Sequence, residues 1–347
     1  MRLSPFSVQA DSVDSVLLKR VESAHNPMNN EDDMRPDILM LAPLLDEFEA
    51  ILASTCNLSR AYTVDEQLAL LDDRPERFKV VVTNGGHGVD LQVLARLPEL
   101  RLIAVNGVGL DQIDLEETRR REIQVVTTPD VLTDAVADLA VGLTLAVLRQ
   151  IVVGDRFVRS GEWERRPFQY LGTSMRGQRV GILGLGRIGS AIAQRLIPFG
   201  THLAYHNRQP IEGCDIPYCD SLEQLALQSD ILIIAAAGGA QSRHLVGRQV
   251  LQALGETGVV VNVARGSVVD QAVLTNMLIE GRLAGAGLDV FEEEPKIPAA
   301  LLDLDNVVVQ PHVGSATIQT RRAMARIVVN AVLDFSGVSA STPAVQD

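Results

Sequence analysis

The feature that most constrains this chain is an alternation of short apolar runs with amphipathic segments, repeated in two successive series. In the first series we expect strands at residues 37–42, 78–83, 101–106 and 123–128. In the second we expect strands at residues 179–183, 202–206, 231–236, 258–264, 283–290 and 306–310. Strands that alternate with helices build parallel sheets with helices on both faces. The sequence therefore predicts an α/β protein with two doubly wound parallel-sheet domains.

Helical patterns separate these strands. In the first series they cover residues 44–52, 91–97 and 111–121. A longer apolar-periodic helix begins at about Asp134, with Thr133 or Asp134 as its expected N-cap. A last helix over residues 318–335 closes the pattern.

Composition excludes several classes of partner. The net charge of −13 would repel nucleic acid and anionic membrane surfaces, so we expect neither as a partner. No apolar run reaches the roughly 18 residues of a membrane-spanning helix. The three cysteines, Cys56, Cys214 and Cys219, fit incidental thiols in a reducing cytoplasm, where we place the protein.

Residues 1–36 differ from the rest of the chain because they are polar and lack apolar periodicity. No apolar segment follows Arg2, and the acidic residues argue against an organelle transit peptide. We predict a disordered leader, with Met34 as a candidate for the true start.

The glycine-rich segment GLGRIG at residues 184–189 follows an expected strand and opens a helix. In that context Gly184 permits a tight turn, Gly186 lets a pyrophosphate approach the backbone, and Gly189 lets helix and strand pack closely. The helix N-terminus then presents free N–H groups to the phosphates. Although the motif alone is a weak signal, its placement predicts a dinucleotide site.

The end of the next strand indicates which dinucleotide binds. NAD-binding units usually carry an acidic residue there, which accepts hydrogen bonds from the ribose. This chain instead has Asn207, Arg208 and Gln209. Because Arg208 can pair with a 2′-phosphate, we predict NADPH as the cofactor, with NADH possible at lower preference.

Three further residues supply chemistry suited to a carbonyl group. His312 follows the last strand, and histidine is the natural proton donor near neutral pH. Glu294 or Asp289 could reach its imidazole and favour the charged form. Arg265 leaves a buried strand, where it could bind a carboxylate bidentately. The remaining histidines are read as packed or surface residues: His25, His87, His202, His206 and His244.

These segments together resemble the D-isomer-specific 2-hydroxyacid dehydrogenases, and among them the NADPH-dependent glyoxylate/hydroxypyruvate reductases. The resemblance runs from about Asp37 to Phe335. It is carried by NGVGLDQID (106–114), TTPDVLTDAVADLAVGL (127–143), VGILGLGRIG (180–189), AYHNRQP (204–210), VNVARGSVVD (261–270), GAGLDVFEEEP (285–295) and VVVQPHVGSAT (307–317).

The resemblance implies a flavodoxin-like substrate domain of residues 37–132 and 316–347. It also implies a Rossmann dinucleotide-binding domain of residues 133–315, a cleft between the two, and a homodimer formed through the cofactor domain. His312 would be the acid/base, Glu294 its partner and Arg265 the carboxylate clamp. The implied cofactor contacts are Gly184, Leu185, Gly186, Arg187, Ile188, Gly189, Asn207, Arg208, Ala264, Asp289, His312 and Gly314.

For the substrate, the resemblance implies a small 2-keto acid of the glyoxylate or hydroxypyruvate type, reduced to the D-2-hydroxy acid without a metal. Its carboxylate would bind backbone amides at Gly85 and Gly86 and the guanidinium of Arg265, and its keto oxygen would bind His312. The pair Gly238-Gly239 also occurs in relatives that act on larger acids, so 2-ketogluconate and hydroxyphenylpyruvate stay open. Substrate discrimination is expected near Leu44, Leu45 and His87, with Trp163 or Phe168 reaching across a dimer.

Two other classes compete with this interpretation. The first is an NAD-linked dehydrogenase of the formate or phosphoglycerate type. The second is a dinucleotide-sensing binding protein built on the same fold. Turnover of any keto acid would separate an enzyme from the sensor.

Overall fold

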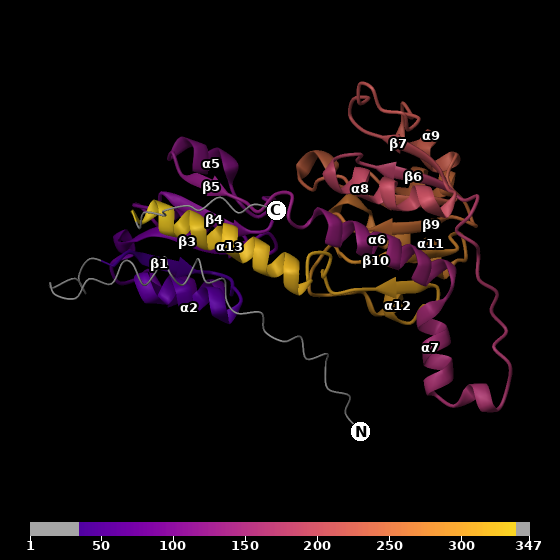
Figure 1. Cartoon of the computed structure of the whole chain (residues 1–347), viewed down its shortest axis with the longest axis horizontal. Helices are drawn as coiled ribbons and strands as arrows, with labels where there is room; N and C mark the ends of the chain where they lie inside the picture. The colour runs from indigo at the N-terminus through magenta and orange to yellow at the C-terminus, as the bar shows by residue number, and fades with distance from the viewer. Residues whose placement is uncertain (1–34, 338–347) are drawn as a thin grey trace. The chain divides into compact units, whose positions relative to one another are not determined.

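The computed structural model describes residues 35–337, which form two compact units (Figure 1). Unit 1 contains the described residues up to Pro129 and those from Arg321 onward, and unit 2 contains Asp130–Thr320. The predicted leader, except for its last two residues, lies outside the described residues, as does the candidate start Met34.

Unit 1 is built on a five-stranded parallel sheet in the order β2-β1-β3-β4-β5. This is the 2-1-3-4-5 order of flavodoxin-like folds, as predicted. Its strands are β1 (Asp37–Met40), β2 (Asn57–Arg60), β3 (Phe78–Asn84), β4 (Leu102–Asn106) and β5 (Gln124–Val126). Its helices are α2 (Asp46–Thr55), α3 (Val64–Leu70), α4 (Leu91–Ala95), α5 (Leu115–Arg120) and most of α13 (Ile318–Phe335).

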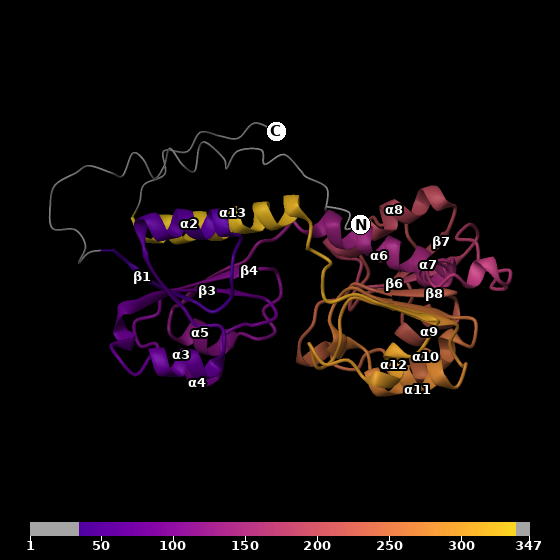
Figure 2. The ribbon, with the colours of Figure 1, turned by 90° about the horizontal axis from the view of Figure 1, so that it is seen from below.

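Helices cover both faces of this sheet because successive side chains of a strand point to opposite faces. Ile38 and Met40 of β1 pack in one core with residues of α2 and α13. Leu39 and the adjoining Leu41 pack in a second core with residues of α4. Figure 2 shows α2 and α13 on one side of the sheet and α3, α4 and α5 on the other.

Unit 2 is built on a six-stranded parallel sheet in the order β11-β10-β9-β8-β6-β7. Its strands are β6 (Arg179–Leu183), β7 (His202–His206), β8 (Ile231–Ile234), β9 (Val259–Asn262), β10 (Gly285–Leu288) and β11 (Val307–Val309). A single parallel bridge joins Tyr205 to Tyr218 beyond β7. If the bridged segment at Tyr218 is counted as a short strand, the sheet can be read from that edge toward β11. Its first six strands then have the 3-2-1-4-5-6 order of a Rossmann fold.

The helices of unit 2 are α6 (Thr133–Leu148), α7 (Ile151–Arg159), α8 (Arg187–Leu196), α9 (Leu222–Leu227), α10 (Arg248–Leu254), α11 (Gln271–Ile279) and α12 (Ala299–Leu302). Leu225, Leu251 and Leu274 of α9, α10 and α11 share one core with Val260 of β9 and Ala286 of β10. Figure 2 shows α6 and α8 on the opposite side of the sheet. The fold class predicted from the sequence, two doubly wound parallel sheets, is confirmed.

Some elements differ from the prediction. The edge strand β2 has the sequence NLSR and is largely exposed, so it lacks the apolar pattern by which strands are recognised. Helix α3 was also missed, although Thr63 and Glu66 form a capping box that signals its start. The expected N-cap of α6 is wrong, because the helix already includes Thr133 and its N-cap is Leu132. Asp134 instead pairs with Arg195 of α8 at 2.7 Å.

Among the described residues, no single helix is long and apolar enough to cross a membrane. One bent pair, α6 with α7, passes the same criteria of length and composition, with a bend of 63°. Cys56 and Cys219 are buried and Cys214 is partly buried, and none of the three forms a disulfide.

Candidate active site

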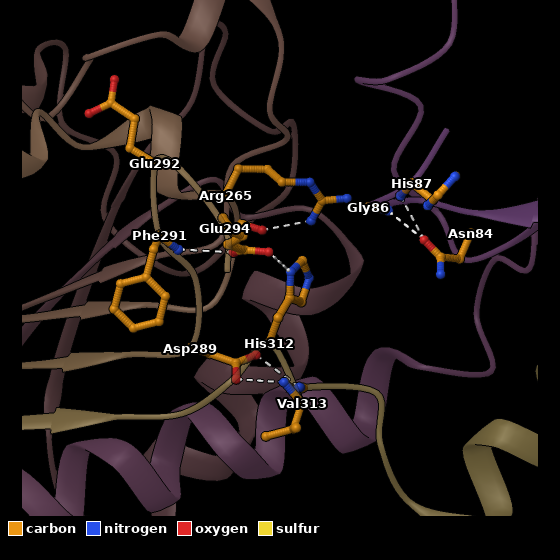
Figure 3. A network of polar contacts seen from close by, with 12 residues as sticks. Asn84, Gly86, His87, Arg265, Asp289, Phe291, Glu292, Glu294, His312 and Val313 are labelled. Atoms are coloured by element: carbon orange, nitrogen blue, oxygen red, sulfur yellow. Dashed lines mark hydrogen bonds and ion pairs between the residues drawn. The ribbon is translucent and has the colours of Figure 1, made fainter. Parts of the chain in front are cut away.

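Three neighbouring strands of unit 2 deliver the predicted catalytic residues to one edge of the sheet. Asn262 at the end of β9 is in register with Leu288 of β10, which is in register with Val309 of β11. Arg265, Asp289 and His312 each follow the end of one of these strands within a few residues. Because the carboxyl ends of parallel strands share an edge, residues far apart in the sequence meet there (Figure 3).

His312 and Glu294 form a close pair. His312 Nδ1 lies 2.7 Å from Glu294 Oε2, and the other carboxylate oxygen accepts a hydrogen bond from Phe291 N at 2.9 Å. A carboxylate can only accept, so Nδ1 carries the hydrogen and Nε2 is left for a substrate. Both side chains are partly exposed, 37% for His312 and 32% for Glu294. Of the two acids that the sequence left open as the imidazole's partner, the structure brings Glu294 to it.

The pKa of Glu294 is lowered by its surroundings. Partial burial by itself would raise this pKa. The hydrogen bonds from His312 and Phe291, with the positive charges of His312 and Arg265, outweigh that effect and lower the pKa. Glu294 is therefore held as a carboxylate, with its negative charge beside the imidazole of His312.

Asp289 lies beneath the turn that carries His312. Its side chain is buried, and its two oxygens accept hydrogen bonds from Val313 N at 2.7 Å and Gly314 N at 2.8 Å. Its carbonyl oxygen accepts a third from His312 N at 2.8 Å. His312 has a φ of +54°, which is uncommon for a residue with a side chain. Three hydrogen bonds from one residue therefore hold a turn that the backbone would not favour alone.

The environment of Asp289 acts on its pKa in the opposite direction. Burial raises the pKa of Asp289, and the negative charge of Glu294 adds to the rise. The two amide hydrogen bonds and the positive charge of His312 oppose it. The site thus holds two carboxyl groups whose surroundings shift their pKa values apart.

The turn that carries Arg265 is fixed by a buried asparagine and by a glycine. Asn262 Oδ1 accepts a hydrogen bond from Ala264 N at 3.0 Å, and its Nδ2 donates to Arg265 O at 3.0 Å. A Cβ on Gly266 would lie 1.8 Å from the carbonyl carbon of Phe291, so only glycine fits there. Gly266 thereby lets the Arg265 turn lie directly against the segment that leads to Glu294.

Sequence reasoning missed the role of Asn262. The available signal was an asparagine at the end of a buried strand, a residue type that hydrogen-bonds to nearby backbone in turns.

Sequence reasoning also missed that the segment leading to Glu294 is held in place by contacts of Glu292. Glu292 Oε1 lies 2.8 Å from Arg243 Nη2 and 2.7 Å from His244 Nε2, and its amide donates to Gln271 at 3.0 Å.

The glycine turn has the geometry of a dinucleotide cradle. It connects β6 to α8, with Gly186 as the helix N-cap. A Cβ on Gly189 would lie 2.1 Å from Gly184 O, which explains the close packing of helix and strand. A Cβ on Gly186 would meet no protein atom within 4 Å, so the space above the helix N-terminus is open. The residues present therefore fit a bound pyrophosphate.

The residues after β7 lie beside this turn. Asn207 Oδ1 accepts a hydrogen bond from Leu185 N at 2.7 Å, so Asn207 closes the glycine turn. Arg208 is exposed, and its Nη1 donates to Gln241 Oε1 at 3.4 Å. Arg187 is also exposed and pairs with Asp130 at 2.7 Å. Two guanidinium groups thus flank the cradle, each with only a weakly held, solvent-exposed partner.

The predicted substrate loop belongs to unit 1 and directly follows β3. Asn84 Oδ1 accepts hydrogen bonds from Gly86 N at 3.0 Å and His87 N at 2.7 Å. Gly88 N donates to Asn84 O at 2.9 Å, which closes the loop. The amide of Gly86 is therefore already engaged by a side chain of the same loop. Figure 3 shows Asn84 turned toward these two amides.

Between residues 35 and 337, no group of three or more His, Cys, Asp or Glu side chains is arranged to hold a metal ion.

Comparison with known proteins defines the class. Residues 141–314 match the model of the D-isomer specific 2-hydroxyacid dehydrogenase, NAD binding domain. The chain belongs to this family, and it is an oxidoreductase with a nicotinamide-dinucleotide-binding domain. The family predicted from the sequence motifs is confirmed.

Particular relatives narrow the comparison. The chain is 46% identical to glyoxylate/hydroxypyruvate reductase A of Arabidopsis thaliana, over 89% of this chain and 98% of that protein. It is 43% identical to hydroxyphenylpyruvate reductase of Plectranthus scutellarioides, with the same two coverages. A crystal structure of NADPH-dependent glyoxylate/hydroxypyruvate reductase from Sinorhizobium meliloti, with NADP and malonate, superposes with a TM-score of 0.83. That match has 41% identity and covers 89% of this chain and 97% of that one.

Gly266→Ala should lower the free energy of unfolding by about 2 kcal/mol or more, because its Cβ has no room beside Phe291. Urea denaturation followed by circular dichroism measures this. Gly247→Ala is the matched control, since the nearest atom to its Cβ would be His244 O at 3.4 Å. The control should change stability by less than about 1 kcal/mol. Equal stability of the two variants would contradict the close approach.

Glu294→Gln should make the protein less sensitive to acid. Because folding lowers the pKa of Glu294 below its ordinary 4.5, ionisation stabilises the fold above that pH. That contribution is lost as the pH falls through the lower folded-state pKa. Urea midpoints between about pH 6 and pH 3 should therefore fall less steeply in the variant than in the native protein. Glu293→Gln, at the exposed neighbouring position, serves as the control; a native slope in Glu294→Gln would refute the coupling.

Proposed function

We propose that this protein reduces glyoxylate or hydroxypyruvate to the corresponding D-2-hydroxy acid with NADPH. The coarser assignment, a 2-keto acid reductase, follows from family membership and from relatives named as reductases of such acids. The observation that carries the proposal is the 2.7 Å contact between His312 Nδ1 and Glu294 Oε2. In this arrangement the negative charge of Glu294 lies beside the imidazole, and the other ring nitrogen, Nε2, is available to bind a carbonyl oxygen.

When bound, the dinucleotide supplies the hydride, and the residues of the chain supply the remaining requirements. His312 donates the proton from Nε2 to the keto oxygen, and Glu294 stabilises the imidazolium before that transfer. Arg265 binds the substrate carboxylate and polarises the carbonyl, aided by the amides of Gly85 and Gly86. For the Gly86 amide to take part, Asn84 Oδ1 must turn away from it.

The cofactor is proposed to lie along Gly184–Gly189, with Ala264, Asp289 and Gly314 near its nicotinamide end. Residues 133–315 would form the cofactor domain, and residues 37–132 with 316–347 the substrate domain. NADPH is preferred because Arg208 follows β7 where an acid would otherwise bind the ribose. The NADP-bound structure from Sinorhizobium meliloti supports this preference.

We also propose a homodimer that forms through unit 2 in the cytoplasm. Several large apolar side chains of α7 and the segment that follows are strongly exposed. They are Ile151 at 54%, Val158 at 51%, Trp163 at 64% and Leu171 at 92%. An exposed group of this kind is typical of a surface covered by another subunit. With a net charge of −13, neither nucleic acid nor an anionic membrane is a proposed partner.

A larger 2-keto acid is the alternative substrate. The 43% identity to hydroxyphenylpyruvate reductase supports it, as does the Gly238-Gly239 loop after β8. A substrate panel separates the small from the larger 2-keto acids. Oxidation of NADPH is monitored by its absorbance with glyoxylate, hydroxypyruvate, hydroxyphenylpyruvate and 2-ketogluconate. Highest kcat/KM with the two small acids supports the proposal, and highest kcat/KM with either larger acid would replace it.

His312→Ala should lower kcat by about 10²–10⁴-fold, because it removes the group proposed to protonate the keto oxygen. Glu294→Gln should also lower kcat, by a smaller factor than His312→Ala, since the imidazole loses the carboxylate that orients it. Full pH profiles of kcat with hydroxypyruvate measure both effects. A nearly unchanged kcat in His312→Ala would rule out its role.

Arg208→Ala should raise KM for NADPH by about tenfold or more and leave KM for NADH within about twofold, because only NADPH carries a 2′-phosphate. Arg119→Ala, an exposed arginine of α5 in unit 1, controls for the loss of one positive charge. Equal changes in the two KM values, or none, would exclude Arg208 as the phosphate contact.

A further inference from the structure

A buried glutamine of unit 1 contacts a histidine of the predicted substrate loop. Gln67 of α3 is 1% exposed, although glutamine is seldom buried. Its Nε2 donates to Ala61 O at 3.1 Å and lies 3.0 Å from His87 Nε2. The two hydrogens of one amide group thus serve two partners, one on the backbone and one on the imidazole.

This contact fixes the protonation state of His87. An amide nitrogen only donates, so His87 Nε2 must accept and cannot carry a hydrogen. The reverse orientation of the amide is excluded, because its oxygen would then face the carbonyl oxygen of Ala61. His87 is therefore neutral, with its hydrogen on Nδ1. Desolvation lowers the pKa of His87, which also favours the neutral form.

The main chain of His87 is held as firmly as its ring. Its amide donates to Asn84 Oδ1 at 2.7 Å, and Thr83 Oγ1 donates to Gly88 O at 2.6 Å. His87 is nevertheless an exposed residue. Within the described part of the chain, no side chain or backbone group pairs with its Nδ1. The loop thus presents one fixed N–H donor from the residue next to Gly86.

We propose that His87 Nδ1–H recognises an oxygen on C3 of the 2-keto acid, which makes His87 a specificity-determining residue and Gln67 its positioning residue. This inference rests on the proposed function, in which Gly85 and Gly86 bind the substrate carboxylate. The matching substrate is a 3-hydroxy-2-keto acid such as hydroxypyruvate. A neutral donor with fixed orientation pairs with a hydroxyl oxygen, whereas glyoxylate has no C3 and gains nothing from it.

The kinetic test compares hydroxypyruvate with glyoxylate in each variant. In His87→Ala, the ratio of kcat/KM for hydroxypyruvate to kcat/KM for glyoxylate should fall by about tenfold. A change of this size corresponds to the loss of about one neutral hydrogen bond. His87→Asn should retain most of the native ratio, because the asparagine amide can place an N–H near the position of Nδ1. His202→Ala, at the exposed start of β7 in unit 2, should leave the ratio as in the native enzyme.

An unchanged ratio in His87→Ala, with both substrates still turned over, would overturn the inference and leave the proposed function standing. An equal loss for both substrates would do the same, since it indicates general disturbance of the loop. No turnover of either acid by the native enzyme would instead reject the proposed function.

The tautomer can be tested without turnover. Long-range ¹H–¹⁵N spectra of the full-length protein at pH 7 should contain the signals of a neutral histidine protonated on Nδ1 that disappear in His87→Asn, while the signals of the other histidines remain. A doubly protonated His87, or one protonated on Nε2, would overturn the inference whatever the assay shows.

Discussion

The active-site edge of unit 2 depends on the buried carboxylate of Asp289. Its two oxygens and its carbonyl bind three successive amides of the turn at residues 312–314. That turn forces His312 into a φ of +54°, a conformation that needs support from its surroundings. A buried carboxylate is stable only when it is hydrogen-bonded, so Asp289 and the turn require each other. The position of the imidazole, and hence its contact with Glu294, follows from this.

The two carboxyl groups of the site do different work because their surroundings differ. Burial raises the pKa of Asp289. The side chain of this residue accepts hydrogen bonds from the backbone of the turn. The pKa of Glu294 is lowered, because two hydrogen bonds and nearby positive charge outweigh the effect of burial. Glu294 therefore supplies the negative charge beside His312. The Arg265 turn is placed by contacts of another kind, the buried amide of Asn262 and the missing side chain of Gly266.

Sequence reasoning predicted the elements whose pattern is local. β6, β7 and α13 have the predicted bounds, since each combines an apolar period with clear ends. It missed β2, which is polar and lies at a sheet edge. Reasoning from the residues alone named His312, Arg265 and Glu294 but left open which acid meets the imidazole, and the family resemblance indicated Glu294. That choice, like the approach of Gly266 to Phe291 or of Gln67 to His87, depends on segments distant in the chain.

We propose that the His312–Glu294 pair protonates a keto oxygen while hydride reaches one face of the carbonyl. The stereochemistry of the product tests this most directly. Hydroxypyruvate would be reduced with NADPH by the full-length protein, and the glycerate resolved by chiral chromatography. The account predicts D-glycerate alone. L-glycerate or a mixture of both isomers would contradict it, as would tight dinucleotide binding with no product at all.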